Sequence, residues 1–376
     1  MSATIPFIDL QAQRRRIGEP MNRAIAAAVE GGQWILGPQV SELEEKLAAF
    51  AGVKHAVACA NGTDALMIVL RAWNIGPGDA VFVPAFTFAA SAEVVALVGA
   101  SPVFVDVCED TYNMDPASLE AAIALMKREG KLVPRAVMPV DLFGQPADYA
   151  ALEPIIAREK LLMLCDTAQG FGGTHGSTQT AATGDAAATS FFPAKPLGCY
   201  GDGGATFTND DGLAELLRSI RMHGQGADRY ENVRIGVNSR LDTIQAAILL
   251  EKLKVFPAEI EMREAVARRY NKAFASSNSI RVPHIIEGAQ SVWAQYTLQV
   301  ENRAKLQADL KAKGIPTAVY YPIPLNAQKG YVQYPSAPVP VCERISQTVV
   351  SLPMYPDLGP GTQDRIIEAV LESVGA

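Results

Sequence analysis

The sequence predicts an α/β protein: a large domain with a mostly parallel sheet flanked by helices, and a smaller α+β C-terminal domain. Its 376 residues are too many for one compact core. Short β-rich runs alternate with amphipathic stretches in the first part of the chain, which is typical of a parallel sheet covered on both faces. After Arg240 this alternation ends and long helical patterns begin. We therefore expect a large domain at residues 1–245 and a small domain at residues 246–376.

The alternation can be followed element by element. A capping box at residues 41–44 predicts the start of a helix that places Leu43, Leu47 and Phe50 on one face. The strands that we expect after it are residues 57–60, 80–83, 103–106, 136–140 and 161–165. The helices that we expect between them are one from Thr63, one at residues 92–98, one that begins at Asp115-Pro116, and one at residues 148–159.

The second part of the chain has a different order of elements. Two helical patterns cover residues 241–256 and 259–274. They are followed by an expected strand at 292–300, a helix at 302–313, a strand at 316–321 and a last helix at 363–370. No internal repeat or low-complexity tract interrupts this order.

Charge and cysteine content narrow the class of protein. A formal net charge of -7 argues against nucleic-acid binding, which usually needs a basic face. The five cysteines are scattered without metal-ligand spacing, so we expect no metal site and no disulfide framework. Neither a signal peptide nor a membrane span is apparent, and we expect a cytoplasmic protein with no membrane partner. An anionic substrate would then need a local positive site.

Ligands of an open parallel sheet collect at the carboxyl ends of its strands, and polar groups follow several of the expected strands. The first group is Asn61-Gly62-Thr63-Asp64. Gly62 lets a ligand approach the backbone, and the helix from Thr63 offers free N–H groups to a phosphate. The alternative is an ordinary strand-to-helix turn with Thr63 as its cap.

The second group is Asp166, directly after a buried strand. A carboxylate there needs a partner, because an unpaired buried charge is costly, and a protonated ring nitrogen of a cofactor would satisfy it. The alternative is an Asp that caps the next helix. Gln169, three residues on, either hydrogen-bonds the same ligand or is a polar residue of the protein surface.

The third group surrounds Lys195, which lies between Pro193 and Pro196 in an apolar aromatic stretch. Desolvation there would lower the pKa of the amine and make it nucleophilic toward a carbonyl, whereas the alternative is a solvated loop lysine. Ser190 offers a further hydroxyl to a phosphate. The glycine-rich residues 200–205 lack the GxGxxG spacing and lead into a strand, so they do not indicate a dinucleotide site.

At these residues the chain resembles the DegT/DnrJ/EryC1/StrS sugar aminotransferases, which have the pyridoxal-phosphate (PLP) transferase fold type I. The resemblance spans nearly the whole chain, from residues 7–10 through 35–38 to 321–325. It implies that PLP forms a Schiff base with Lys195 and pairs its ring nitrogen with Asp166. It also implies a ring stacked on Phe88, a ring oxygen near Gln169, and a phosphate held by Gly62, Thr63, Asp64 and Ser190.

The run at residues 236–240 resembles the family's loop that enters the neighbouring subunit, where Asn238 would touch the phosphate of the partner's cofactor. The alternative is that Asn238 caps the helix that begins at Leu241. The resemblance thus implies a homodimer with two shared active sites.

The resemblance also bears on the substrate. Many relatives carry His where this chain has Tyr320 and Asn326, and the stretch 190–205 is most similar to aminotransferases of UDP-linked 3-keto-2-acetamido sugars, including the uronate. Sugars with a 4-keto group linked to dTDP, UDP or GDP are the alternatives. Our candidates for sugar and pyrophosphate contacts are Arg229, Arg240, His223, Tyr320 and Tyr321. For each, a surface ion pair or a packing aromatic is the alternative role.

The implied reaction is ping-pong, with glutamate as amino donor and a nucleotide-linked keto sugar as acceptor, and with Lys195 as general base and acid. Dehydratase relatives replace this lysine with His, so its presence argues against that activity. A non-catalytic regulator with the same fold is the rival from another class, and it would be expected to have lost Lys195 or Asp166.

Overall fold

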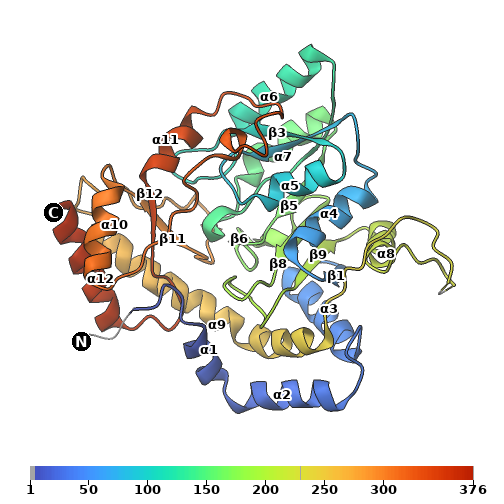
Figure 1. The fold of residues 1–376 in the computed structure, drawn as a ribbon, viewed down its shortest axis with the longest axis horizontal. Coiled ribbons are helices and arrows are strands. Elements are labelled where there is room, and N and C mark those ends of the chain that lie inside the picture. The colour runs from blue at the N-terminus through green and yellow to red at the C-terminus, as the bar shows by residue number, and fades with distance from the viewer. Residues whose placement is uncertain (1–4, 229, 376) are drawn as a thin grey trace.

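The computed structural model describes residues 5–228 and 230–375. Its centre is a seven-stranded sheet in the order β1-β9-β8-β5-β4-β2-β3 (Figure 1). The strands are β1 (His55–Cys59), β2 (Asp79–Pro84), β3 (Ser101–Val105), β4 (Val133–Val137), β5 (Leu162–Asp166), β8 (Ala186–Ser190) and β9 (Gly204–Thr208). The five strands from β8 to β3 are parallel, and only β9 runs antiparallel to its neighbours. The predicted mostly parallel sheet is confirmed.

Alternation along the strands supplies a core to each face of the sheet. In β2, Ala80 and Phe82 point to one hydrophobic cluster, while Val81 and Val83 point to the other. The first cluster packs under α3 (Pro38–Ala51), α6 (Pro116–Glu129) and α7 (Tyr149–Glu159). The second packs under α4 (Gly62–Ala72), α5 (Ala90–Leu97) and α8 (Asp211–Ile220). Helices therefore cover both faces, as the alternation predicts.

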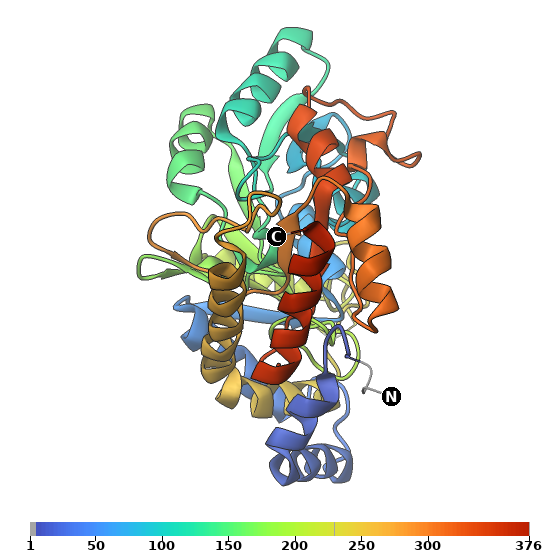
Figure 2. The ribbon, with the colours of Figure 1, turned by 90° about the vertical axis from the view of Figure 1, so that its left-hand side faces the viewer.

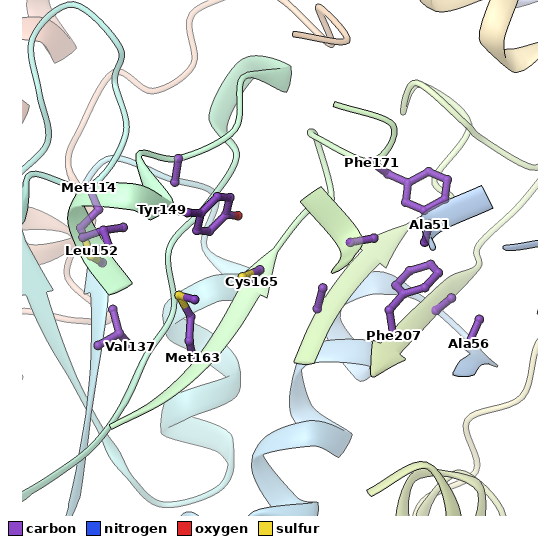
Figure 3. Packing of buried hydrophobic residues seen from close by; sticks show 14 of the residues in the cluster. Ala51, Ala56, Met114, Val137, Tyr149, Leu152, Met163, Cys165, Phe171 and Phe207 are labelled. Atoms are coloured by element: carbon purple, nitrogen blue, oxygen red, sulfur yellow. The ribbon is translucent and has the colours of Figure 1, made fainter. Parts of the chain in front are cut away.

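Figure 3 shows the first cluster from close by, with Phe171 beside Phe207 and with Met163 and Cys165 below Tyr149. The rings of Phe171 and Phe207 are stacked, with centroids 5.4 Å apart. This side of β5 is thus filled by apolar side chains, and the polar end of the strand is left at its carboxyl terminus.

A third cluster lies under the C-terminal elements. β11 (Tyr296–Gln299) pairs antiparallel with β12 (Val349–Leu352). This small sheet packs with α9 (Thr243–Phe274), α10 (Arg303–Ala312) and α12 (Pro360–Val374), which Figure 2 shows beside one another. Because α9 runs unbroken across residues 245 and 246, the division of the chain there stays a prediction.

The remaining elements are short or peripheral. The helices are α1 (Leu10–Ile17), α2 (Glu19–Glu30) and α11 (Pro340–Thr348), and single 3-10 turns cover Leu142–Gly144, Thr180–Ala182 and Leu325–Ala327. The strands β6 (Thr174–His175), β7 (Thr178–Gln179) and β10 (Ala289–Gln290) form a small sheet of their own. Within the described residues, no helix has both the length and the apolar character that crossing a bilayer requires.

Two predicted helix boundaries and one predicted strand were wrong. The capping box at residues 41–44 does not begin a helix, because α3 starts at Pro38, a residue suited to the first turn. The two predicted helices at 241–256 and 259–274 are one helix of 32 residues that contains Pro257. Its buried face, which includes Phe256 and Ile260, outweighs the one hydrogen bond that a proline removes. Residues 316–321 form only an isolated bridge from Ala318 to Ser351.

Candidate active site

A pocket of about 700 Å³ opens at the carboxyl ends of the parallel strands. Its walls come from the segments after β1, β2, β4, β5 and β8, together with three residues from the C-terminal part of the chain. Ten of the residues singled out from the sequence line it: Gly62, Thr63, Asp64, Phe88, Asp166, Gln169, Ser190, Lys195, Tyr320 and Tyr321. The topology of the sheet thus brings together groups that lie up to 259 residues apart in sequence, from Gly62 to Tyr321.

Asp166 ends β5, is buried and lines this pocket. Its Oδ2 accepts a hydrogen bond from Ser91 Oγ at 2.8 Å, and its Oδ1 accepts one from the Ala168 backbone N–H at 3.2 Å. Burial raises the pKa of the Asp166 carboxyl above its ordinary value. No helix follows Asp166 before β6, so it does not cap one among the described residues.

The donors on Asp166 are neutral, and no described cation lies within ion-pairing distance of it. A buried carboxylate of this kind suits a cationic N–H group that a ligand brings with it. The sequence did not point to Ser91, which reaches Asp166 from α5 across 75 positions.

Lys195 lies in the tight loop that follows β8. Its backbone N–H donates to the Phe192 carbonyl at 2.8 Å, and the Cys199 N–H closes the loop by donating to the Phe191 carbonyl at 2.7 Å. A Cβ on Gly198 would lie 2.6 Å from the carbonyl oxygens of Phe192 and Pro193, so the loop in this conformation has space only for glycine at this position. Desolvation by the surrounding protein lowers the pKa of the Lys195 ammonium, and the nearby Asp166 opposes this shift. Lys195 is therefore not an ordinary solvated loop lysine.

The N-terminus of α4 forms another part of the pocket wall. Asn61 caps it, since Asn61 Oδ1 accepts from the Asp64 N–H at 2.8 Å, so Thr63 is not the cap. The described residues offer no acceptor to the N–H groups of Gly62 and Thr63. A Cβ on Gly62 would lie 2.6 Å from the Ser190 Cβ, which shows how closely α4 approaches the end of β8. These N–H groups and the two hydroxyls of Thr63 and Ser190 form a cradle suited to a phosphate.

Aromatic and amide groups complete the pocket. Phe88 is 56% exposed although it is a large apolar side chain, so it has a face free for a planar ring. Its ring centroid lies 6.4 Å from that of Tyr321. Gln169 is buried and holds two groups, since its Oε1 accepts from the Phe143 N–H at 3.0 Å and its Nε2 donates to Tyr321 Oη at 3.4 Å.

The remaining predicted contacts are not part of this pocket within one chain. His223, Asn238 and Arg240 do not line it, and Arg229 lies outside the described residues. The alternative role for Asn238 as a helix cap is wrong, because Asp242 precedes the first residue of α9. Asn238 is exposed, while the next residue, Ser239, is buried and accepts a hydrogen bond from the Ala60 N–H at 3.2 Å. The loop thus presents Asn238 to the outside of the molecule.

The pocket of a single chain has an excess of negative charge. Asp64, Glu93, Asp166 and Asp202 line it, and Lys195 is the cation among its described lining residues. The sequence did not point to Glu93, which belongs to no motif, and Asp202 lies in the glycine-rich run 200–205, to which we assigned no ligand. An anionic ligand would therefore need further positive groups.

The model of the DegT/DnrJ/EryC1/StrS aminotransferase family matches residues 15–371. The chain is 49% identical over 354 residues to the UDP-2-acetamido-2-deoxy-3-oxo-D-glucuronate aminotransferase of Pseudomonas aeruginosa, which covers 94% of this chain and 96% of that relative.

Solved structures agree with this match. A DegT DnrJ EryC1 StrS aminotransferase from Brucella abortus superposes with a TM-score of 0.97 at 53% identity, covering 99% of this chain and 100% of that one. NtdA from Bacillus subtilis, with bound cofactor PMP, superposes with a TM-score of 0.91 at 29% identity, covering 100% of this chain and 86% of that one.

Proposed function

The chain belongs to the DegT/DnrJ/EryC1/StrS aminotransferase family and is a PLP-dependent sugar aminotransferase, and we propose that its amino donor is glutamate. We propose that the acceptor is a UDP-linked 3-keto-2-acetamido sugar, with the uronate as our first choice. The observation that carries this proposal is the 49% identity, over almost the whole chain, to an aminotransferase named for the 3-oxo-glucuronate. The reaction would take place in the cytoplasm.

The residues that line the pocket suit the phosphate, the ring and the ring nitrogen of PLP. The cradle of Gly62, Thr63 and Ser190 would hold the phosphate, and Phe88 would stack on the ring. Asp166 would accept the ring N–H and keep that proton in place, since a cation there is what the buried carboxylate lacks. Asp64 lines the same wall, but its backbone N–H already donates to Asn61, so that donor does not reach a phosphate.

Lys195 would carry both the attachment and the proton transfer. PLP, when bound, accepts the amino group and withdraws electrons from the reacting carbon. Lys195 Nζ would hold the cofactor and, once displaced, would move a proton between the reacting carbon and the neighbouring atom. The lowered pKa of this lysine favours the neutral amine, which is the form that takes up a proton.

We propose further that two copies share each active site. Asn238 is exposed and outside its own pocket, and the same loop exposes apolar side chains, with Val233 49% and Ile235 80% accessible. Exposed apolar side chains of this kind favour contact with a partner surface. The acidic pocket needs cations for a phosphate and a pyrophosphate, and Arg240 of a partner copy would supply one. Within its own chain Arg240 does not line the pocket.

The first test is the colour of the purified protein loaded with PLP. We expect a yellow protein that glutamate bleaches, because glutamate would give its amino group to the bound PLP. Lys195→Ala should bind the cofactor without this reaction and should lose turnover, since no other described residue that lines the pocket carries a side-chain amine. Substantial turnover in Lys195→Ala would overturn the role of Lys195.

The second test is a panel of keto sugars given to the glutamate-treated protein. We expect amination of the UDP-linked 3-keto-2-acetamido sugar and its uronate, detected by mass of the product. Reaction of a 4-keto sugar alone would overturn the proposed substrate and leave the family assignment intact.

A further inference from the structure

Two loops meet at one wall of the pocket in a strained contact. Phe143 and Trp293 both have left-handed backbones, with φ of 60° and 49°. Between them, Gly144 has φ of 104°, and a Cβ there would lie 2.7 Å from the backbone nitrogens of Trp293 and Ala294. Non-glycine residues adopt such backbones when the surrounding structure imposes them, and they cluster at functional sites. This contact joins the loop after β4 to the segment that leads into β11.

The contact places one glutamine in the pocket. The Gln295 backbone N–H donates to the Phe143 carbonyl at 3.3 Å, and the Val292 N–H donates to the Gly144 carbonyl at 3.0 Å. Phe143 is held from its other side by Gln169, whose amide also reaches Tyr321. Gln295 therefore belongs to the same wall as Gln169 and Tyr321, and its side chain lines the pocket with theirs.

The amide of Gln295 has no partner of its own among the described residues. Its Oε1 is buried, yet no described donor reaches it. The other glutamine of the pocket, Gln169, holds two groups. Gln299, four residues along the chain from Gln295 and outside the pocket, donates to the Glu109 carbonyl at 3.0 Å and accepts from Thr348 Oγ1 at 3.1 Å. A buried acceptor without a donor is rare in proteins, and in a binding pocket its expected partner is a ligand.

We propose that Gln295 is a sugar-binding residue whose Oε1 accepts a hydrogen bond from a hydroxyl or N–H group of the sugar ring. This inference rests on the proposed function, because it takes a nucleotide-linked keto sugar as the second substrate. Glutamate fits the position poorly, since its carboxylates are acceptors and its amino group is needed at the reacting atom. Gln295 would thus distinguish the two substrates that use the same pocket in turn.

The test compares Gln295→Met with Gln299→Met. Both changes keep the length of the side chain and remove its amide, but of the two amides only that of Gln299 has partners among the described residues. The bleaching by glutamate and the amination of the UDP-linked 3-keto-2-acetamido sugar are followed separately. We expect Gln295→Met to lower kcat/KM for the sugar about tenfold, the loss typical of one hydrogen bond, with no change in the glutamate half-reaction or in PLP affinity.

The control should show the opposite pattern. Gln299→Met should lower the melting temperature and leave the sugar kinetics unchanged, while Gln295→Met should keep its melting temperature, since it loses no bond within the chain. A binding readout uses the Lys195→Ala protein: calorimetry with the aminated sugar nucleotide should show about tenfold weaker binding when Gln295→Met is added.

Three results would overturn the role of Gln295. They are unchanged sugar kinetics, an equal loss in the glutamate half-reaction, or a loss of PLP affinity. Failure of the proposed function is distinguishable, because then the wild-type protein would not aminate the 3-keto sugar. The comparison would in that case be made with the panel sugar that the wild-type protein does aminate.

Discussion

At the scale of single residues, the site depends on the Asp166 carboxylate, which is buried and has no ion-pair partner among the described residues. Asp166 is a buried carboxylate that receives only neutral hydrogen bonds, and burial raises its pKa. Such a group destabilises the protein without its ligand and binds a cation strongly. The buried carboxylate therefore lowers the stability of the cofactor-free protein and provides a binding site for a cationic group.

This leads to a prediction for Asp166→Asn, which keeps the size of the side chain. The single-turnover rate with glutamate should fall by a factor of about 10² to 10⁴, because an amide does not keep a ring nitrogen protonated and the loss of a buried ionic partner costs about 3–5 kcal/mol. The protein without cofactor should melt at the same or a higher temperature than the wild type, since an uncompensated charge is removed. A single-turnover rate near that of the wild type would show that Asp166 serves only its local hydrogen bonds.

At the scale of elements, the phosphate cradle depends on how closely α4 approaches β8. Gly62 begins α4, and its missing side chain allows the helix to lie against Ser190. The N–H groups of the first turn are positioned by this contact and by the Asn61 cap. The cradle is thus a property of two packed elements rather than of one motif.

Gly62→Ala should therefore weaken cofactor binding. The new methyl group would lie 2.6 Å from the Ser190 Cβ, so α4 must move away from the end of β8. Overpacking of this kind costs about 1–3 kcal/mol, and we expect the Kd for PLP to rise about tenfold or more, measured by titration of the protein without cofactor. Gly76→Ala is the matched control, because its Cβ would meet only the Val98 carbonyl at 3.7 Å. Equal affinities in both variants would mean that the contact does not shape the cradle.

At the scale of the whole molecule, we propose that the active site combines residues of two chains. Lys195 lies in the pocket of its own chain, whereas Asn238 is exposed on a loop outside it. In a homodimer with shared sites, each site would combine Lys195 of one copy with Asn238 of the other. The excess of carboxylates in the pocket of a single chain is consistent with this need for a partner.

Mixing two inactive variants tests this arrangement. Asn238→Asp should weaken PLP binding in both sites of its homodimer, because a carboxylate repels the phosphate. After subunit exchange with Lys195→Ala, one site of each mixed dimer has both residues intact, and the other has both changes. Activity should then reappear, at about half that of a wild-type dimer for each mixed dimer. If exchange is demonstrated and no activity returns, Asn238 acts within its own chain.

The sequence alone determined the class of fold and the identity of the main groups at the site. Alternating β-rich and amphipathic runs predict a parallel sheet because each run buries its own local pattern of apolar side chains. Asp166 and Lys195 stood out for the same reason: a charged group beside a buried strand or between prolines conflicts with its immediate neighbours. Boundaries were less accurate, since the start of α3 and the continuity of α9 depend on packing.

Only the tertiary structure decided which distant groups meet. The hydrogen bond from Ser91 to Asp166, the approach of Gly62 to Ser190 and the entry of Gln295 into the pocket all join residues that are far apart in the chain. No local pattern encodes these contacts, because each arises where separate elements pack against one another. The unpaired amide of Gln295 is the clearest case: in the sequence it is one glutamine within the expected strand 292–300, and the strained contact of two loops makes it part of the site.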